Sequence, residues 1–248
     1  MIDPERFCES LAQLATQAGF AQQTLAEISG YPLLAFQRNA RGAGESPFRL
    51  YLSSGVHGDE PAGPLAIARM LENDLLPQRL ELVLLPFINP TGFALRTREN
   101  ALGQDLNRDF RHPKNQETLA VKNLIDSLPP FDLSLALHED WESVGFYMYS
   151  ISPDSDPSKA RAILEAVEQA GPLERSSLID GSPAHGGLID RPANFDIEGR
   201  DDWPEAFLLY SKSRHAHYTL ESASSAPLEQ RIAQHTAGVL RAIELHCS

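Results

Sequence analysis

Two nearly continuous apolar segments constrain the fold of this chain more than any other feature. Residues 80–88 and 131–137 consist almost entirely of apolar side chains, which is typical of strands buried on both faces. Stretches with the spacing of amphipathic helices lie at residues 61–74, 116–128, 158–171 and 228–246. Strands that alternate with helices favour a parallel sheet covered on both sides. The sequence therefore predicts one α/β/α domain over residues 1–248, with a central mixed, mostly parallel sheet of about eight strands.

The remaining segments add one helix and several shorter strands to this prediction. The helix is expected at residues 4–18, where it ends at a glycine. The shorter strands are expected at residues 24–29, 33–38, 48–54, 146–151 and 218–220. Residues 179–214 are dense in glycine, proline and charge, and we expect this segment to be loop-rich.

Charge and composition exclude several classes of partner. The 34 acidic residues outnumber the 21 basic ones, and the formal net charge of −13 repels phosphate backbones, so we expect no nucleic-acid partner. No basic cluster and no apolar run of membrane-spanning length is present, so we expect no membrane contact. Residues 1–19 are amphipathic, with acidic residues early, unlike a secretory signal. These features predict a cytoplasmic protein.

His57 and Glu60 follow the strand expected at residues 48–54, after a glycine-containing turn. An imidazole and a carboxylate together suit Zn²⁺, although a solvated surface pair is the common alternative for this spacing. His138 and Glu221 also come directly after predicted strands. Because functional sites of such sheets gather beyond the carboxyl ends of the strands, we expect these side chains to lie together.

Further segments carry a family resemblance. Arg98 lies nine residues before Asn107, within a Gly-x-Asp-Leu-Asn-Arg-x-Phe stretch that also contains Asp105 and Arg108. With the His57/Glu60 pair, His138 and Glu221, this order resembles the zinc carboxypeptidase superfamily typified by carboxypeptidase A. The bacterial murein peptide amidases look closest, since their motif has the same arginine spacing. The aspartoacylase and succinylglutamate desuccinylase branch shares the core motifs. The resemblance extends from about Ser53 to Glu221.

The resemblance implies a metal centre with three protein ligands. His57, Glu60 and His138 would bind one Zn²⁺ and leave a fourth position open, as in catalytic zinc sites. Asp105 matches the carboxylate that contacts the far ring nitrogen of the first histidine and fixes its orientation.

It also implies catalytic and substrate-binding roles. Glu221 matches the glutamate that takes a proton from the attacking water and passes it to the leaving amine. Arg98 matches the arginine that stabilises the developing oxyanion. Asn107 and Arg108 match the pair that binds the free carboxylate of the substrate.

Simpler interpretations of these residues remain open. Asp105 and Asn107 are also common turn residues. Arg108 is equally suited to a surface salt bridge, and Arg96 is an alternative to Arg98.

The neighbours of the motif residues carry simpler expectations. Glu139, Asp140 and Glu142 are expected to be solvated or to shape the pocket, with Glu139 the next candidate for the base. His215 and His217 are expected not to touch the substrate, and Trp141 and Trp203 are expected to be packing residues.

One element of the family pattern is missing. Carboxypeptidases carry a mobile-loop tyrosine in a stretch with Gly-Gly, upstream of the catalytic glutamate. The corresponding segment here, residues 185–190, has no tyrosine just before it. Tyr210 is a distant candidate for that role, and Ile189 is a candidate for the wall of the side-chain pocket.

The predicted function is therefore zinc-dependent hydrolysis of an amide or peptide bond next to a free carboxylate in small peptides, as in carboxypeptidases or murein peptide amidases. One alternative is an N-acyl amino acid deacylase of the aspartoacylase or succinylglutamate desuccinylase type. That branch usually has an extra C-terminal β domain, whereas only one helix is expected after Glu221. Another alternative is a catalytically silent zinc-binding relative, although binding alone requires neither Glu221 nor Arg98.

Overall fold

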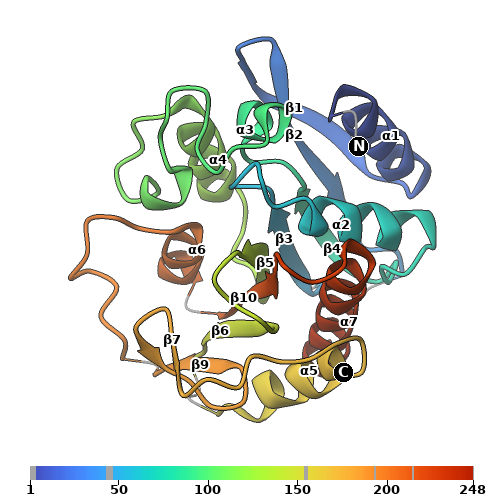
Figure 1. The fold of residues 1–248 in the computed structure, drawn as a ribbon. Coiled ribbons are helices and arrows are strands. Elements are labelled where there is room, and N and C mark those ends of the chain that lie inside the picture. The colour runs from blue at the N-terminus through green and yellow to red at the C-terminus, as the bar shows by residue number, and fades with distance from the viewer. Residues whose placement is uncertain (1–3, 43–46, 154–155, 193, 214, 248) are drawn as a thin grey trace.

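The computed structural model describes residues 4–42, 47–153, 156–192, 194–213 and 215–247. These residues form an eight-stranded sheet in the order β1-β2-β4-β3-β5-β10-β6-β9 and a separate two-stranded sheet (Figure 1). The large sheet consists of β1 (Ala21–Ile28), β2 (Tyr31–Arg38), β3 (Arg49–Ser54), β4 (Glu81–Leu85), β5 (Leu133–Asp140), β6 (Tyr147–Ile151), β9 (Leu188–Arg191) and β10 (Ala216–Ala223). The small sheet consists of β7 (Leu178–Ile179) and β8 (Ser182–Pro183).

The centre of the large sheet is parallel and its outer strands are mixed. Strands β4, β3, β5 and β10 run parallel to one another. On one side β2 pairs antiparallel with β4 and β1 with β2, and on the other β6 pairs antiparallel with β10. The last strand, β9, runs parallel to β6. This arrangement confirms the predicted α/β fold with a mixed, mostly parallel sheet.

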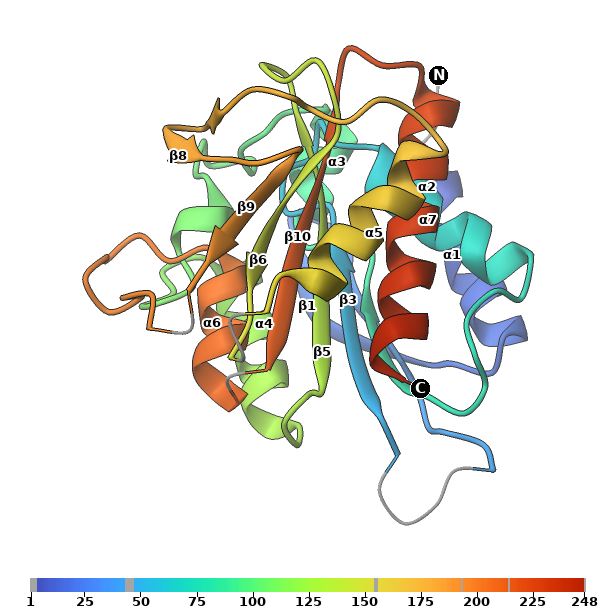
Figure 2. The same cartoon turned by 90° about the horizontal axis from the view of Figure 1, so that it is seen from below.

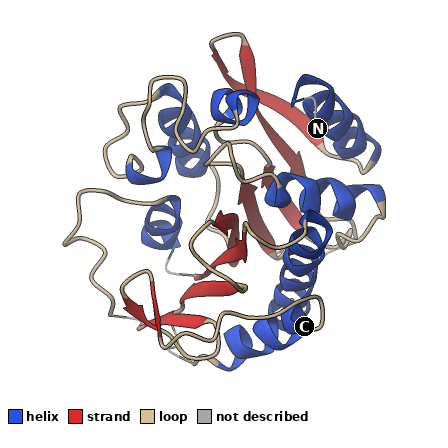
Figure 3. Cartoon of the chain, viewed as in Figure 1, coloured by secondary structure: helices blue, strands red, loops and turns tan. Residues whose placement is uncertain are grey.

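Helices cover both faces of the sheet (Figures 2 and 3). One face carries α1 (Pro4–Gln17), α2 (Ala62–Glu72), α5 (Ser158–Glu168) and α7 (Leu228–His246). The other face carries α4 (Gln116–Ser127) and α6 (Glu205–Ser213). Two short helices, α3 (Pro90–Leu95) and the 3₁₀ helix η1 (Leu106–Arg108), lie in the connection between β4 and α4. No helix in the described part of the chain is long and apolar enough to cross a membrane.

Strand β4 shows why the apolar segments are continuous. Leu82 and Leu84 pack into the core beneath α1, α2, α5 and α7, whereas Val83 and Leu85 pack into the core on the opposite face. Successive side chains of a strand point to opposite faces, so a strand between two helical layers needs apolar residues at every position.

Residues 179–214, which were expected to be loop-rich, also contain regular elements besides the short strands β7 and β8. Residues 188–191 form the edge strand β9, and residues 205–213 form α6. The start of α6 is stabilised from a distant part of the chain, because Oδ1 of Asn107 accepts a hydrogen bond of 2.9 Å from the backbone N–H of Glu205. Side-chain oxygens that cap helices are normally close in sequence. A local pattern therefore gives no signal for this helix.

Candidate metal centre and active site

The parallel strands β3, β5 and β10 bring the candidate residues to one edge of the sheet. Ser54, the last residue of β3, pairs with Leu137 of β5, next to His138. His138 in turn pairs with Glu221 of β10. The expectation that these strand ends meet is therefore confirmed.

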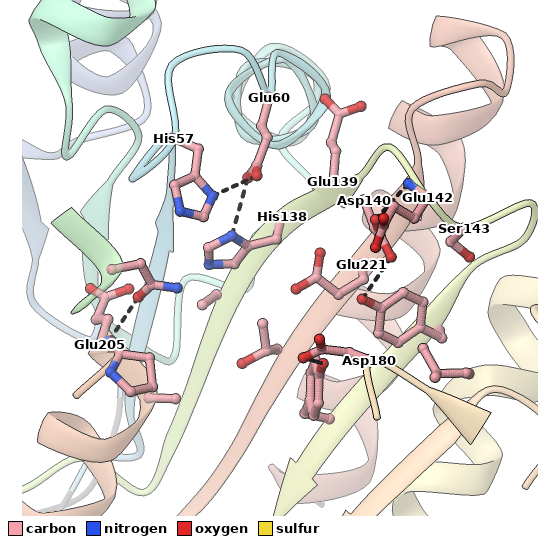
Figure 4. Close-up of a pocket in the computed structure, with 18 of the residues that line it drawn as sticks. His57, Glu60, His138, Glu139, Asp140, Glu142, Ser143, Asp180, Glu205 and Glu221 are labelled. Atoms are coloured by element: carbon pink, nitrogen blue, oxygen red, sulfur yellow. Dashed lines mark hydrogen bonds and ion pairs between the residues drawn. The ribbon is translucent and has the colours of Figure 1, made fainter. Parts of the chain in front are cut away.

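His57, Glu60 and His138 form a compact group of possible metal ligands (Figure 4). One ligand atom from each lies within 4.8 Å of the others, and all three residues are buried. Nδ1 of His57 lies 2.6 Å from Oε1 of Glu60, and Nδ1 of His138 lies 3.1 Å from Oε2. Two imidazole nitrogens thus face one carboxylate, which is a donor set that Zn²⁺ accepts.

The chemistry of this group fits a cation. Oε2 of Glu60 is buried and accepts no hydrogen bond of acceptable geometry, although His138 is near. Burial alone lowers the pKa of His57, but the carboxylates of Glu60 and Asp105 raise it to about 9. The two histidines hold the pKa of Glu60 well below its usual range against the effect of burial. The positive charge of the protonated imidazoles therefore compensates the negative charge of the buried Glu60 carboxylate. A divalent metal ion displaces such protons when it binds.

Asp105 lies behind His57, outside the residues that line the cavity. Its Oδ1 lies 3.2 Å from Nε2 of His57 and accepts a hydrogen bond of 2.9 Å from the backbone N–H of Asn107. Its Oδ2 accepts hydrogen bonds of 3.1 and 3.3 Å from Arg98. The structure thus places Asp105 both in a turn and in contact with His57.

A cavity of about 470 Å³ brings most of the candidate residues together. Its described lining includes His57, Glu60, Arg98, Asn107, Arg108, His138 and Glu221. Arg96 is not among these lining residues and caps the end of α3 with a left-handed backbone (φ 57°). Of the two arginines considered, Arg98 is thus the one at the cavity, where its Nη1 lies 3.8 Å from Oε1 of Glu60.

Glu221 carries a carboxyl group with a raised pKa. Its side chain extends into the cavity beside His138 (Figure 4). Burial raises the pKa of Glu221 to about 8. The charge of His138 lowers this pKa, whereas the charges of Glu60 and Asp140 raise it further. A carboxyl group with such a pKa can accept and release a proton near neutral pH.

Asn107 and Arg108 line the cavity from η1. The Oδ1 of Asn107 is occupied by the backbone N–H of Glu205. The side chain of Arg108 is 47% exposed, and its Nε lies 4.0 Å from Oδ2 of Asp202. Arg108 is thus a half-exposed cation at the cavity edge, with a weak surface ion pair.

Glu139, Asp140 and Glu142 all line the cavity, as expected of residues that shape it, and Glu139 alone of the three is buried. Glu139 is buried, accepts a hydrogen bond of 2.6 Å from the backbone N–H of Ala62 and pairs with Arg231. Asp140 and Glu142 line the cavity, and Oδ2 of Asp140 accepts a hydrogen bond of 3.1 Å from the hydroxyl of Tyr147. Glu139 therefore connects α2 to α7.

The two tryptophans differ from each other. Trp203 is 6% exposed and donates a hydrogen bond of 2.8 Å to the carbonyl of Ile197, as expected of a packing residue. Trp141 is 76% exposed and lines the cavity, so the packing prediction is wrong for it. The buried His215 and His217 do not line the cavity.

The two candidates for the missing part of the family pattern are also wrong. Tyr210 belongs to α6 and is 1% exposed, with its side chain in the core between that helix and the sheet. Ile189 is 1% exposed in a hydrophobic cluster with Tyr147. Neither lines the cavity. Tyr147 and Tyr149 of β6 line it instead. Their period of two along the predicted strand 146–151 was the signal that could have identified them, since residues at that spacing share one face.

Comparisons with known proteins agree with this geometry. The model of the succinylglutamate desuccinylase/aspartoacylase catalytic domain matches residues 47–186. Carboxypeptidase SOL1 of Arabidopsis thaliana is 32% identical over 95 residues, which are 34% of this chain and 19% of that protein. Carboxypeptidase 2 of Trichophyton rubrum is 28% identical over 132 residues, which are 50% of this chain and 24% of that protein. The match therefore spans about a fifth to a quarter of the length of these relatives.

Solved structures share the fold over nearly the whole chain. A candidate metallopeptidase from Shewanella amazonensis is 27% identical, with a TM-score of 0.84 over 98% of this chain and 93% of that one. A metallo-carboxypeptidase from Burkholderia cenocepacia is 18% identical, with a TM-score of 0.72 over 98% of this chain and 68% of that one. The chain therefore belongs to the succinylglutamate desuccinylase/aspartoacylase catalytic-domain family, within the zinc carboxypeptidase-like superfamily of hydrolases.

Proposed function

We propose that this protein is a zinc-dependent hydrolase that cleaves an amide bond next to a free carboxylate in small substrates. The observation that carries the proposal is the shared cavity. The ligand atoms of His57, Glu60 and His138 converge there beside Glu221, and cationic side chains lie at its edge. Two imidazoles and one carboxylate favour a single Zn²⁺ over a harder cation such as Mg²⁺.

The proposed mechanism divides the work between the metal and the protein. A Zn²⁺ ion bound by His57, Glu60 and His138 would supply Lewis-acid chemistry. Glu221 accepts a proton from the attacking water and delivers it to the leaving amine, as its raised pKa allows. The guanidinium group of Arg98, at the cavity and close to Glu60, stabilises negative charge on the carbonyl oxygen.

Asn107 and Arg108 are the proposed site for the substrate carboxylate. Glu205 fixes Oδ1 of Asn107, so the other end of the amide, the Nδ2 donor, is the group presented to a ligand. Arg108 adds a positive charge at the same cavity edge. An amide donor beside a guanidinium group is a suitable receptor for a carboxylate.

Two substrate classes share this chemistry. The carboxypeptidase relatives support small peptides as substrates. The family match supports acylated amino acids as a second candidate. A catalytically silent zinc protein is the weaker alternative, since Arg98 and Glu221 both line the cavity together with the possible ligands.

The test combines metal analysis with a substrate panel of dipeptides, a murein tripeptide and N-acyl amino acids. We expect one zinc per chain in the wild type and loss of most of it in His138→Ala, because two remaining ligands bind poorly. Glu221→Gln should keep its zinc but lose at least about a hundredfold in turnover. Glu165→Gln, on the exposed surface of α5, is the matched control and should behave as the wild type.

Three results would contradict the proposal. These are full zinc occupancy in His138→Ala, near-normal turnover in Glu221→Gln, and a zinc-loaded wild-type protein that cleaves no member of the panel.

A further inference from the structure

Exposed apolar side chains lie on two segments that border the cavity. Trp141 and Val144, between β5 and β6, are 76% and 79% exposed, and Leu178 of β7 is 62% exposed. They account for three of the seven large hydrophobic residues that are exposed in the described part of the chain. Trp141 and Leu178 line the same cavity as the possible metal ligands. Exposed apolar groups gathered at a cavity mouth are typical of a binding surface.

The two segments that carry these side chains are fixed to each other. The carboxylate of Glu174 accepts hydrogen bonds from Oγ of Ser143 (3.1 Å) and the backbone N–H of Val144 (3.2 Å) in one segment. In the other segment it accepts hydrogen bonds from the backbone N–H (2.9 Å) and Oγ (2.6 Å) of Ser176. Trp141 and Leu178 are therefore carried by segments that are already joined, which reduces the ordering cost of binding.

A close backbone approach supports the same junction. A side chain at Gly145 would place its Cβ 2.5 Å from the backbone of Leu173 and of Glu174. The N–H of Glu174 donates a hydrogen bond of 2.8 Å to the carbonyl of Phe146, whose own N–H donates one of 3.0 Å to the carbonyl of Pro172. The segment that leads to Leu178 is thus joined to the start of β6 by backbone hydrogen bonds.

The segment that carries the exposed tryptophan lies on the side of the possible metal ligands opposite to Glu205 (Figure 4). In Figure 4, Asp140, Glu142 and Ser143 lie on one side of His138, and Glu205, which contacts Asn107, lies on the other. Trp141 belongs to the first group by sequence. A substrate with its carboxylate near Asn107 and its amide bond near Glu221 therefore extends its acyl portion towards Trp141.

We propose that Trp141 and Leu178 form an acyl-side subsite that binds an apolar or aromatic group of the substrate. The inference rests on the proposed amide hydrolysis and narrows its substrate class. An indole offers a large flat apolar surface on which aromatic groups stack. Its sequence neighbours Asp140 and Glu142 also line the cavity and repel acidic acyl groups. The subsite therefore favours neutral aromatic acyl groups over short or acidic ones such as succinyl.

The kinetic test compares N-benzoyl and N-acetyl derivatives of the same amino acid. We expect wild-type kcat/KM to be about tenfold or more higher for the benzoyl substrate. In Trp141→Ala this advantage should fall to about twofold, chiefly through a higher KM for the benzoyl substrate, and Trp141→Phe should restore most of it. Leu102→Ala is the matched control, since Leu102 is also 76% exposed but does not line the cavity.

A binding test is independent of turnover. The chain has two tryptophans, and Trp203 is buried, so Trp141 should dominate any ligand-induced change in fluorescence. In the Glu221→Gln protein, the benzoyl derivative should shift the emission to shorter wavelength. The shift should be absent after a second substitution, Trp141→Ala.

Each outcome separates the subsite from the proposed function. If both substrates are cleaved equally well and the emission does not move, the subsite is refuted and the hydrolase function stands. If zinc-loaded wild type cleaves neither substrate nor any member of the panel above while the benzoyl derivative still shifts the emission, the hydrolase function is refuted and the binding surface stands.

Discussion

Replacement of Asp105 by asparagine tests the metal centre without knowledge of the substrate. The carboxylate of Asp105 contacts Nε2 of His57 and two nitrogen atoms of Arg98. In Asp105→Asn the side chain keeps its size and one acceptor but loses its negative charge. If the Oδ1 contact to His57 is kept, the new NH₂ group takes the place of Oδ2, which lies 3.1 Å from Nη2 of Arg98. Two hydrogen-bond donors then face each other.

The expected magnitude follows from these contacts. A carboxylate on the far nitrogen of a metal-binding histidine fixes the ring orientation and makes the histidine a stronger ligand. Loss of such a partner lowers metal affinity about ten- to a hundredfold, or about 1.4 to 2.8 kcal/mol. The repulsion between Arg98 and the amide favours the upper part of this range. The fold should survive, because the asparagine can still accept the backbone N–H of residue 107.

The assay is zinc titration of the metal-free protein in competition with a chromophoric chelator. The matched control is Asp109→Asn in the same motif. The carboxylate of Asp109 accepts hydrogen bonds from the backbone N–H of Asn115 (3.0 Å) and from Oγ1 of Thr118 (2.6 Å). Neither of these partners is a possible metal ligand. That variant should lose stability and keep its zinc affinity. A zinc affinity of Asp105→Asn within about twofold of wild type would refute the argument, as would an equal loss in Asp109→Asn.

Two further predictions concern the edges of the cavity. The wild type should prefer a substrate with a free carboxylate over the amidated substrate by about tenfold in kcat/KM, and Arg108→Ala should reduce this ratio to near unity. The effect is modest because Arg108 is half exposed. An unchanged ratio would show that Arg108 does not bind the carboxylate. Glu174→Gln should lower the free energy of unfolding by about 2 kcal/mol at neutral pH, measured by urea denaturation. Hydrogen bonds from Ser176 lower the pKa of Glu174 from 4.5 to about 2, so this stabilisation is present above pH 4.5 and is lost as the pH falls towards 2. A difference between the two proteins that stays constant across that window would contradict this assignment.

The grouping of the three possible metal ligands was predictable because their signals are local. His57 and Glu60 follow one buried strand within six residues of its end, and His138 lies near the end of another. The apolar segments identify these strands, and the carboxyl ends of parallel neighbours meet at one edge of a sheet. Short-range patterns and topology together thus place the three ligands.

Helix α6 was not predictable for the opposite reason. Its sequence lies in a segment dense in glycine, proline and charge, and its first backbone N–H group is satisfied by Asn107, which lies 98 positions earlier. Glu205 at its start is buried against Tyr51 and Ser53, which are still more distant in sequence. Tertiary contacts of this kind override local propensity.

The exposure of Trp141 beside the cavity was also not predictable from the sequence. Residue type alone favours burial of a tryptophan, and Trp203 follows that tendency while Trp141 does not. The difference arises because Trp141 lies at the end of β5, where the chain leaves the sheet above the cavity.

The candidate metal centre and the proposed carboxylate site share one closed set of hydrogen bonds. His57 contacts Asp105, whose Oδ1 caps the backbone of Asn107, and the amide of Asn107 caps α6 at Glu205. The carboxyl group of Glu205 accepts a hydrogen bond of 2.6 Å from Oγ of Ser53, on the strand that leads to His57. Each member therefore orients the next, and the set returns to its starting strand. In this motif the turn residues and the functional residues are the same residues, because one carboxylate and one amide hold the backbone and the site at once.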